Sequence, residues 1–266
     1  AGAVGGAIWG VFPGLFKAYF NVNEVITAIM FNWIGMYLVN LLLANMPNML
    51  ASGWGASNSD RTAALNVANP GAILPRGPFA ALFGNSSWIN ISIIITIIFA
   101  ILVWVILQKT TFGYELKACG ANRHAARYAG IHDRRNIVCS MAIAGAMAGA
   151  AGALYYLSGN TEFFWTTYQS LPSEGFDGIA VALLAVNNPI GVIFTGIFMS
   201  LLSIAGLQLT NLTAYNEYIT DVIISVIVYL SAFSLAIRMM LSRKKKPHAH
   251  VEETAAPAAD AAPPEE

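Results

Sequence analysis

Long apolar runs alternate with polar connections along this chain, and most of the runs have the length of a membrane-crossing helix. A helix needs roughly 20 mostly apolar residues to cross the hydrocarbon core of a bilayer. Such runs occupy residues 1–16, 25–45, 88–108, 137–158, 190–209 and 219–237. A shorter run, 176–186, comes before an Asn-Asn-Pro break. The pattern predicts an all-α, polytopic helical membrane protein with about six spans, one of them a short broken helix.

Two of the predicted spans carry small residues at helical spacing. In the first, every fourth residue is a glycine: Gly2, Gly6, Gly10 and Gly14. The span at 137–158 has a second set of glycines: Gly145, Gly149 and Gly152. Small residues on one helix face allow the backbone of another helix to approach closely. We therefore expect each of these faces to lie against a neighbouring helix.

The composition agrees with a membrane protein of the helical type. Hydrophobic residues make up 56% of the chain and charged residues 11%, whereas about 25% of an ordinary soluble domain is charged. A transmembrane β-barrel would alternate apolar and polar positions in segments of about ten residues, but the apolar runs here are continuous. The two cysteines, Cys119 and Cys139, lie in or beside a basic segment, which is expected on the reducing side, so no disulfide is predicted.

The charge distribution predicts which ends of the spans face the cytoplasm. The connection 109–136 is a basic island that holds six of the fourteen basic residues: Lys109, Lys117, Arg123, Arg127, Arg134 and Arg135. With this island inside, and with 176–186 crossing much of the bilayer, twelve of the fourteen basic residues lie on the cytoplasmic side. This bias is the positive-inside pattern. It predicts a cytoplasmic C-terminus.

The same pattern divides the chain into a transmembrane domain, 1–240, and a cytoplasmic tail, 241–266. The tail begins with basic residues and continues as an Ala-, Pro- and acid-rich low-complexity segment. The connection 46–87 is predicted to lie outside the cell. A connection of this length is usually functional or disordered, and both docking of an external partner and disorder remain possible at this point.

The chemistry-bearing residues do not point to an enzyme. No Gly-Lys-Ser/Thr follows a glycine-rich stretch, so the chain lacks the P-loop motif of an ATP site. His124 and His132 lie eight residues apart in the island, and His248 and His250 lie in the tail. That spacing does not indicate a metal site. No catalytic grouping of Ser or Cys with His can be assigned.

A short capped helix is predicted inside the basic island. Asn122 is a good N-cap residue, and Gly130 stands where a helix often ends in a left-handed conformation. Between them, Ala125, Ala126 and Ala129 are predicted to share one side, and Arg123 and Arg127 another. Such a helix suits insertion into a groove on another protein. The alternative is an interfacial helix on anionic lipid, which the small apolar side disfavours.

Polar residues in or near the spans are candidates for a solute pathway. Asn23, Glu24 and Asn32 lie at and inside the start of the second span. Four others belong to the broken helix: Glu174, Asp177, Asn187 and Asn188. Polar groups at membrane depth tend to face the bundle interior or a cavity. The alternative for these residues is helix capping and interhelical hydrogen bonding, and Asp177 could cap a helix beginning at Gly178.

Three separated runs of the chain also resemble a known family. They are NVNEVITAIMFNWI (21–34), GYELKACGANRHAARYAGI (113–131) and EGFDGIAVALLAVNNPIGV (174–192). Together they resemble ATP-binding-cassette (ABC) importer permeases of the branched-chain amino acid, ribose and nucleoside type, and they are most similar to the nucleoside and simple-sugar subgroup. Members of that family normally have further spans before the equivalent of Ala1. The resemblance therefore predicts a family member that lacks its N-terminal spans.

The resemblance implies a mechanism, with partners and site residues. Two permease subunits, identical or related, form a path through a bacterial plasma membrane, and membrane lipid surrounds them. A cytoplasmic ATPase subunit uses ATP and Mg, an extracytoplasmic binding protein delivers the solute, and this chain needs no cofactor and no nucleic acid. The residues that match the family's ATPase-coupling segment are Gly120, Asn122, Ala125, Ala126, Tyr128, Ala129, Gly130 and Ile131.

Two other functional classes remain as alternatives. An ion-coupled secondary transporter or channel would normally place paired ionisable groups near the membrane midplane. Here Asp177 and Asp221 lie near span ends, and the span interiors are almost free of charge. A membrane scaffold without transport activity is the second alternative, and the broken helix and the long outer connection argue mildly against it.

Overall fold

The computed structural model describes most of the chain. The described residues are 1–55, 61–75, 90–159, 161–163 and 174–212, together with 218–219, 221–227, 229–230, 233 and 237. The chain divides into two units, 1–205 and 206–266, and the boundary between them lies inside the last long helix. No strand occurs among the described residues, whose single β-bridge joins Leu50 and Thr62. The prediction of an all-α chain is therefore confirmed for this part.

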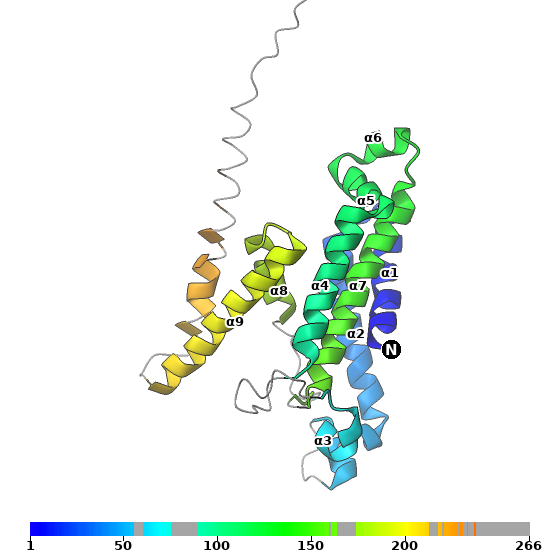
Figure 1. The fold of residues 1–266 in the computed structure, drawn as a ribbon. Helices are drawn as coiled ribbons and strands as arrows, with labels where there is room; N and C mark the ends of the chain where they lie inside the picture. Colours follow the sequence, from blue (N-terminus) through cyan, green and yellow to red (C-terminus); the bar gives the residue numbers. More distant parts are fainter. Residues whose placement is uncertain are drawn as a thin grey trace, which may run out of the picture. The chain divides into compact units, whose positions relative to one another are not determined.

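Nine α-helices have defined bounds in the described chain. They are α1 (Gly2–Phe20), α2 (Glu24–Ala44), α3 (Leu65–Ala68), α4 (Ser92–Lys109), α5 (Thr111–Ala121), α6 (Arg123–Tyr128), α7 (Asp133–Leu157), α8 (Glu174–Leu184) and α9 (Pro189–Leu212). In Figure 1, α1 lies beside α2 and α7, with α5 and α6 near one end of α7 and α3 near the other.

Four of these helices are long and apolar enough to cross a membrane: α2, α4, α7 and α9. They correspond to the predicted spans 25–45, 88–108, 137–158 and 190–209. The predicted span 1–16 forms α1, which has 19 residues and continues to Phe20, but it is not among the four. Within the predicted span 219–237, residues 219, 221–227, 229–230, 233 and 237 are described and are helical, whereas the tail 241–266 lies outside the described residues. The count of about six spans therefore stays a prediction.

The α1 and α7 helices pack against each other through their small residues. A Cβ added at Gly6 would meet the backbone of Gly145 and Gly149, and one added at Gly2 would meet Gly149 O and Ala153 Cβ at 2.8 Å. Further along α1, Gly10 faces Met141 and Gly145, and Gly14 faces Val138 and Met141. The two predicted faces are therefore each other's partner, and the helices run antiparallel.

One glycine of the predicted α7 face does not belong to this contact. The α7 residues that meet α1 follow a four-residue spacing: Met141, Gly145, Gly149 and Ala153. Gly152 lies one position off that spacing, and a Cβ built there meets nothing within 4 Å. Its assignment to the face was wrong, because the contact follows the four-residue ridge of the helix rather than glycine identity.

Aromatic rings join α2 to the other side of α1. Phe31 of α2 lies 5.8 Å from the Trp9 ring, 5.7 Å from Phe12 and 6.0 Å from Phe16, measured between ring centroids. The turn between the two helices begins at Asn21, which has φ 52°. Asparagine is one of the few residues other than glycine that adopts this left-handed conformation readily.

The long connection 46–87 is folded where the structure describes it. Residues 46–55 and 61–75 contain three short 3₁₀ helices and α3. Thr62 N–H donates to Phe163 O at 2.9 Å, and Leu74 N–H donates to Leu157 O at 3.1 Å. Arg61 adds an ion pair to Glu162 at 2.9 Å. The connection is therefore fastened to the C-terminal end of α7 and the residues after it.

The broken helix occurs where the sequence predicted it. The α8 helix ends at Leu184 and α9 begins at Pro189. Val186 and Asn187 between them have φ values of 53° and 55°. The hydroxyl of Thr195 in α9 donates to Val181 O of α8 at 3.2 Å, which ties the two helices together. Asp177 lies inside α8, so its suggested role as an N-cap before Gly178 was wrong.

A substitution on each of two adjacent glycines tests the α1–α7 contact. We expect Gly6→Ala to destabilise the protein by about 1–3 kcal/mol, because its Cβ would force two backbones apart. Gly5→Ala is the control, since nothing lies within 4 Å of a Cβ at Gly5. Thermal unfolding in detergent should show a lower midpoint for Gly6→Ala only. Equal shifts for the two variants would contradict the packing.

Candidate functional site

The basic island folds into two helices between α4 and α7. Thr110 separates α4 from α5 and caps α5, because its hydroxyl accepts a hydrogen bond from Gly113 N–H at 3.1 Å. Gly113 is buried and packs directly on the backbone of Ile106 and Leu107. This close turn, which only a residue without a side chain permits, folds α5 back beside the end of α4.

The predicted capped helix is α6. Asn122 Oδ1 accepts hydrogen bonds from the backbone N–H groups of His124 at 3.0 Å and Ala125 at 3.1 Å. At the other end, Gly130 has φ 83°, its N–H donates to Arg127 O, and Ile131 N–H donates to Ala126 O, both at 3.0 Å. This pattern is the Schellman ending of a helix. Both predicted ends of the short helix are confirmed.

The predicted flat face of three alanines is wrong. Ala126 is buried, with 4% of its surface exposed, whereas Ala125 and Ala129 are exposed. Tyr128 is 94% exposed. The reason is that a helix of six residues lying on α5 and α7 must turn one side inward, and Ala126 lies on that side. A partner protein could therefore reach Ala125, Tyr128 and Ala129 but not Ala126.

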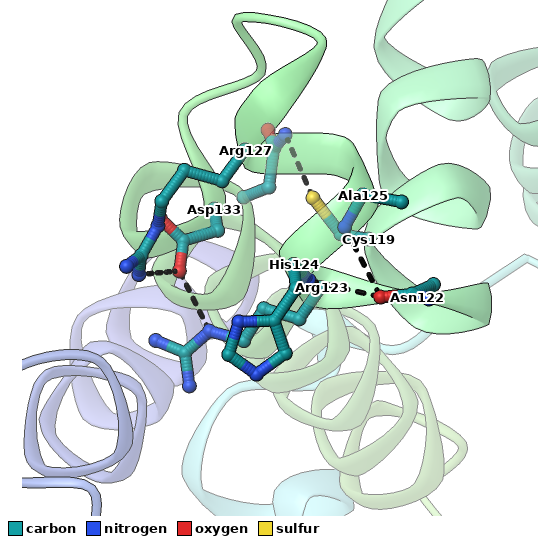
Figure 2. A network of polar contacts seen from close by, with 8 residues as sticks. Cys119, Asn122, Arg123, His124, Ala125, Arg127 and Asp133 are labelled. Atoms are coloured by element: carbon teal, nitrogen blue, oxygen red, sulfur yellow. Dashed lines mark hydrogen bonds and ion pairs between the residues drawn. The ribbon is translucent and has the colours of Figure 1, made fainter.

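Arg123 and Arg127 lie on one side of α6, as predicted, but both are paired with an acid of the same chain. Arg123 Nε lies 2.6 Å and Arg127 Nη2 lies 2.7 Å from the same oxygen of Asp133, Oδ2. Figure 2 shows both guanidinium groups meeting at this carboxylate. The side chain of Asp133 is only 8% exposed. Buried charges are normally paired in this way.

Asp133 belongs to the first turn of α7, before the apolar run that begins at Ile137. Hydrogen bonds from Arg127 and then Arg123 hold the pKa of its carboxyl well below the usual range. The carboxylate is therefore charged throughout the physiological pH range, and its link to α6 does not depend on pH there.

A second buried polar side chain joins α5 to the same turn of α7. Asn136 is 2% exposed. Its Nδ2 donates to Glu115 Oε2 at 3.1 Å and to Cys119 Sγ at 3.6 Å. Asn136 and Asp133 were not among the predicted site residues. The available signal was that Glu115 and Asp133 are the only acids in a basic segment.

A groove lies between α1, α2 and α7, with a volume of about 620 Å³. Its walls include the rings of Trp9 and Phe31, and glycines of α1 and α7. Among the predicted pathway residues, Asn32 lines this groove and supplies an amide to a largely apolar wall. Ligand pockets commonly have this size and a few polar groups on an apolar wall.

The other predicted pathway residues have structural roles or lie apart. Asn23 caps α2, since its Oδ1 accepts from Val25 N–H at 2.9 Å, and Asn188 caps α9 by accepting from Ile190 N–H at 3.0 Å. Glu24 pairs with Lys17 at 2.7 Å. The capping alternative is thus confirmed for the two asparagines, although their place on a solute pathway stays a prediction.

The broken helix does not bring its polar residues together. Glu174 and Asp177 are exposed in the first turn of α8, while Asn187 and Asn188 follow its other end. Asp177 and Asn187 are ten positions apart in the sequence, which corresponds to roughly 15 Å at 1.5 Å per helical residue. Any site that uses both pairs would therefore have to be long.

No metal site is evident in this part of the chain. Among the described residues, no group of three or more His, Cys, Asp or Glu side chains is placed to hold a metal ion. His124 and His132 are exposed. The described geometry offers a short helix with an exposed side and a groove between α1, α2 and α7.

Comparison with known proteins identifies the family. Residues 1–232 match the family described as branched-chain amino acid transport system / permease component. The chain belongs to this permease family. The guanosine ABC transporter permease protein NupP of Bacillus subtilis is 36% identical over 244 residues, which are 92% of this chain and 66% of that protein.

Two further relatives belong to nucleoside and sugar systems. The nucleoside ABC transporter permease protein NupB of Lactococcus lactis is 35% identical over 246 residues, covering 92% of this permease and 65% of NupB. The glucose ABC transporter permease protein TsgB13 of Haloferax volcanii is 26% identical over 206 residues, covering 77% and 52%. The chain spans about two thirds of the length of NupP and NupB. No solved structure matched it significantly.

The cap of α6 can be tested directly in this permease. Asn122→Ala removes the acceptor for two backbone N–H groups, and we expect it to weaken the helix by about 1 kcal/mol. Asn122→Asp keeps an acceptor and serves as the control. Hydrogen exchange of residues 123–128 should be about fivefold faster in Asn122→Ala alone. Equal exchange in the two variants would show that the cap does not hold α6.

Proposed function

We propose that this chain is the transmembrane permease subunit of an ABC importer for a nucleoside or a simple-sugar-type solute. The observation that carries the proposal is the match of residues 1–232 to a permease family, with NupP and NupB as relatives at 36% and 35% identity. A nucleoside is the first choice because the glucose permease TsgB13 is less similar, at 26%.

The energy for transport would come from another protein. The chain carries no P-loop motif, so ATP and Mg would be bound by a separate cytoplasmic ATPase subunit and no cofactor by this chain. The α6 helix would be the contact for that subunit. Its exposed residues Ala125, Tyr128 and Ala129, with exposed Gly120 before it, offer a small surface around one large ring.

The other partners follow from the same proposal. A second permease subunit, identical or related, would complete the translocation path. An extracytoplasmic binding protein would deliver the solute to the outer side, where residues 46–55 and 61–75 form a folded platform on the end of α7. The positive-inside pattern supports a cytoplasmic C-terminus in a bacterial plasma membrane.

The solute path itself is proposed to include the groove between α1, α2 and α7. Asn32 is the pathway candidate with the best support, because it lines this groove beside Trp9 and Phe31. Aromatic faces and one amide suit a solute that has a flat ring and hydrogen-bonding groups. Glu174, Asp177 and Asn187 remain candidates through their place on or beside α8 alone.

Placing a charge on the exposed side of α6 tests the contact with the ATPase. We expect Ala125→Glu to abolish co-purification of the ATPase subunit encoded with the permease, and with it ATP-dependent uptake of radiolabelled guanosine. A carboxylate buried without a partner at a protein interface is strongly unfavourable. Ala126 is unsuitable for this test, because a charge at its buried position would unfold α6.

The matched control for this experiment is Ala44→Glu. Ala44 is exposed and is the last residue of α2. In the proposed orientation, this end of α2 faces away from the cytoplasm, so the same substitution there should leave the ATPase bound. Survival of both ATPase association and guanosine uptake in Ala125→Glu would overturn the assignment of α6. Uptake that proceeds without any ATPase, driven by an ion gradient, would favour a secondary transporter instead.

A further inference from the structure

The α6 helix is joined to its neighbours by non-helical residues at both ends. Asn122 is extended, with φ −155° and ψ 104°, and it separates α6 from α5. On the other side, Gly130 is left-handed and is followed by Ile131 and His132 before α7 begins. Hinges in proteins are formed by such residues. A movement of α6 would therefore not reach the spans through a continuous helix.

Asp133 supplies a direct connection between α6 and α7. Its Oδ2 accepts from Arg123 and Arg127, which lie one helical turn apart on α6, at 2.6 and 2.7 Å. Two anchor points on one short helix fix its rotation as well as its distance from α7. Ala126, which lies between the two arginines in the sequence, is buried. This side of α6 therefore packs against the rest of the protein.

The same turn of α7 is linked to two more helices. The guanidinium group of Arg134 lies over the ring of Tyr19 in α1, 5.5 Å from its centroid. Asn136 binds Glu115 and Cys119 of α5. Further along α7, Gly145 and Gly149 contact the backbone of α1. In backbone contacts of this kind, no flexible side chain lies between the helices that could change its conformation when one helix moves.

We propose that Asp133 is a positioning residue that makes α6, α7 and α1 move as one body. A displacement imposed on α6 would then shift the α1–α7 pair and change the groove that the pair forms with α2. The inference rests on the proposed function, because it assumes that an ATPase acts on α6. Beyond the proposed contact with an ATPase, the inference specifies which spans move with α6 and which carboxylate transmits the movement.

The test substitutes Asp133→Asn in the complete transporter, with its ATPase and binding protein, reconstituted in proteoliposomes. The amide keeps the size of the side chain and removes the charge that holds both arginines. We expect the ATPase to remain bound and to hydrolyse ATP at an unchanged rate. Guanosine uptake per ATP hydrolysed should fall about tenfold or more, as for loss of coupling between two sites.

Hydrogen exchange gives a second measurement that does not depend on transport. The backbone N–H groups of α6 should exchange faster in Asp133→Asn than in the unaltered protein. Arg135→Gln is the matched control, since Arg135 lies on the same turn and forms no ion pair among the described residues. It should change neither exchange nor uptake. Asp133→Glu, which keeps a carboxylate, should restore most of the coupling.

The outcomes separate this inference from the proposed function. Unchanged uptake per ATP in Asp133→Asn would overturn the inference, and so would loss of ATPase binding, because Asp133 would then act on docking. If Asp133→Asn does not accumulate, the single variants Arg123→Gln and Arg127→Gln, which each remove one of the two ion pairs to Asp133, should show partial uncoupling. Failure of the unaltered complex to bind an ATPase or take up guanosine would overturn both the proposed function and the proposed transmission of movement through Asp133. Hydrogen exchange of α6 would still show whether Asp133 holds this helix.

Discussion

The backbone contact between α1 and α7 is the constraint on which the described bundle depends. Lipid tails are as apolar as the side chains of the spans, so helices in a membrane gain little from burying apolar surface and associate through close packing. Here Gly2, Gly6, Gly145 and Gly149 bring the two backbones together, with no side chain between them. This contact fixes the orientation of α7 relative to α1. The segments that are attached to the two ends of α7 are thereby positioned as well.

The two ends of α7 are secured by different forces. At its C-terminal end, backbone hydrogen bonds from Thr62 and Leu74 fasten the long connection to the residues that end and follow the helix. At its N-terminal end, Asp133 and Asn136 are buried and bind groups on α6 and α5. A buried charge requires such partners. The polar end can therefore hold α6 in one orientation, whereas an apolar contact would allow it to slide.

This arrangement changes how α6, the proposed docking helix, is understood. An isolated basic helix could bind either an acidic partner or anionic lipid. With Arg123 and Arg127 paired to Asp133, Ala125, Tyr128 and Ala129 are exposed residues of α6 that carry no charge. A small surface with one prominent ring suits a shaped groove in a protein better than a lipid headgroup layer, which is attracted mainly by charge.

The sequence by itself determined the features that depend on neighbouring residues or on the solvent. The spans follow from the length of apolar chain that a bilayer requires, and the ends of α6 follow from Asn122 and Gly130, whose partners lie within a few residues. The glycine spacing predicted a close contact. Only the tertiary structure decided which helix fills it, that Ala126 is buried and that Arg123 pairs with Asp133. These contacts join residues that no local pattern relates, because they depend on how separate helices are brought together in space.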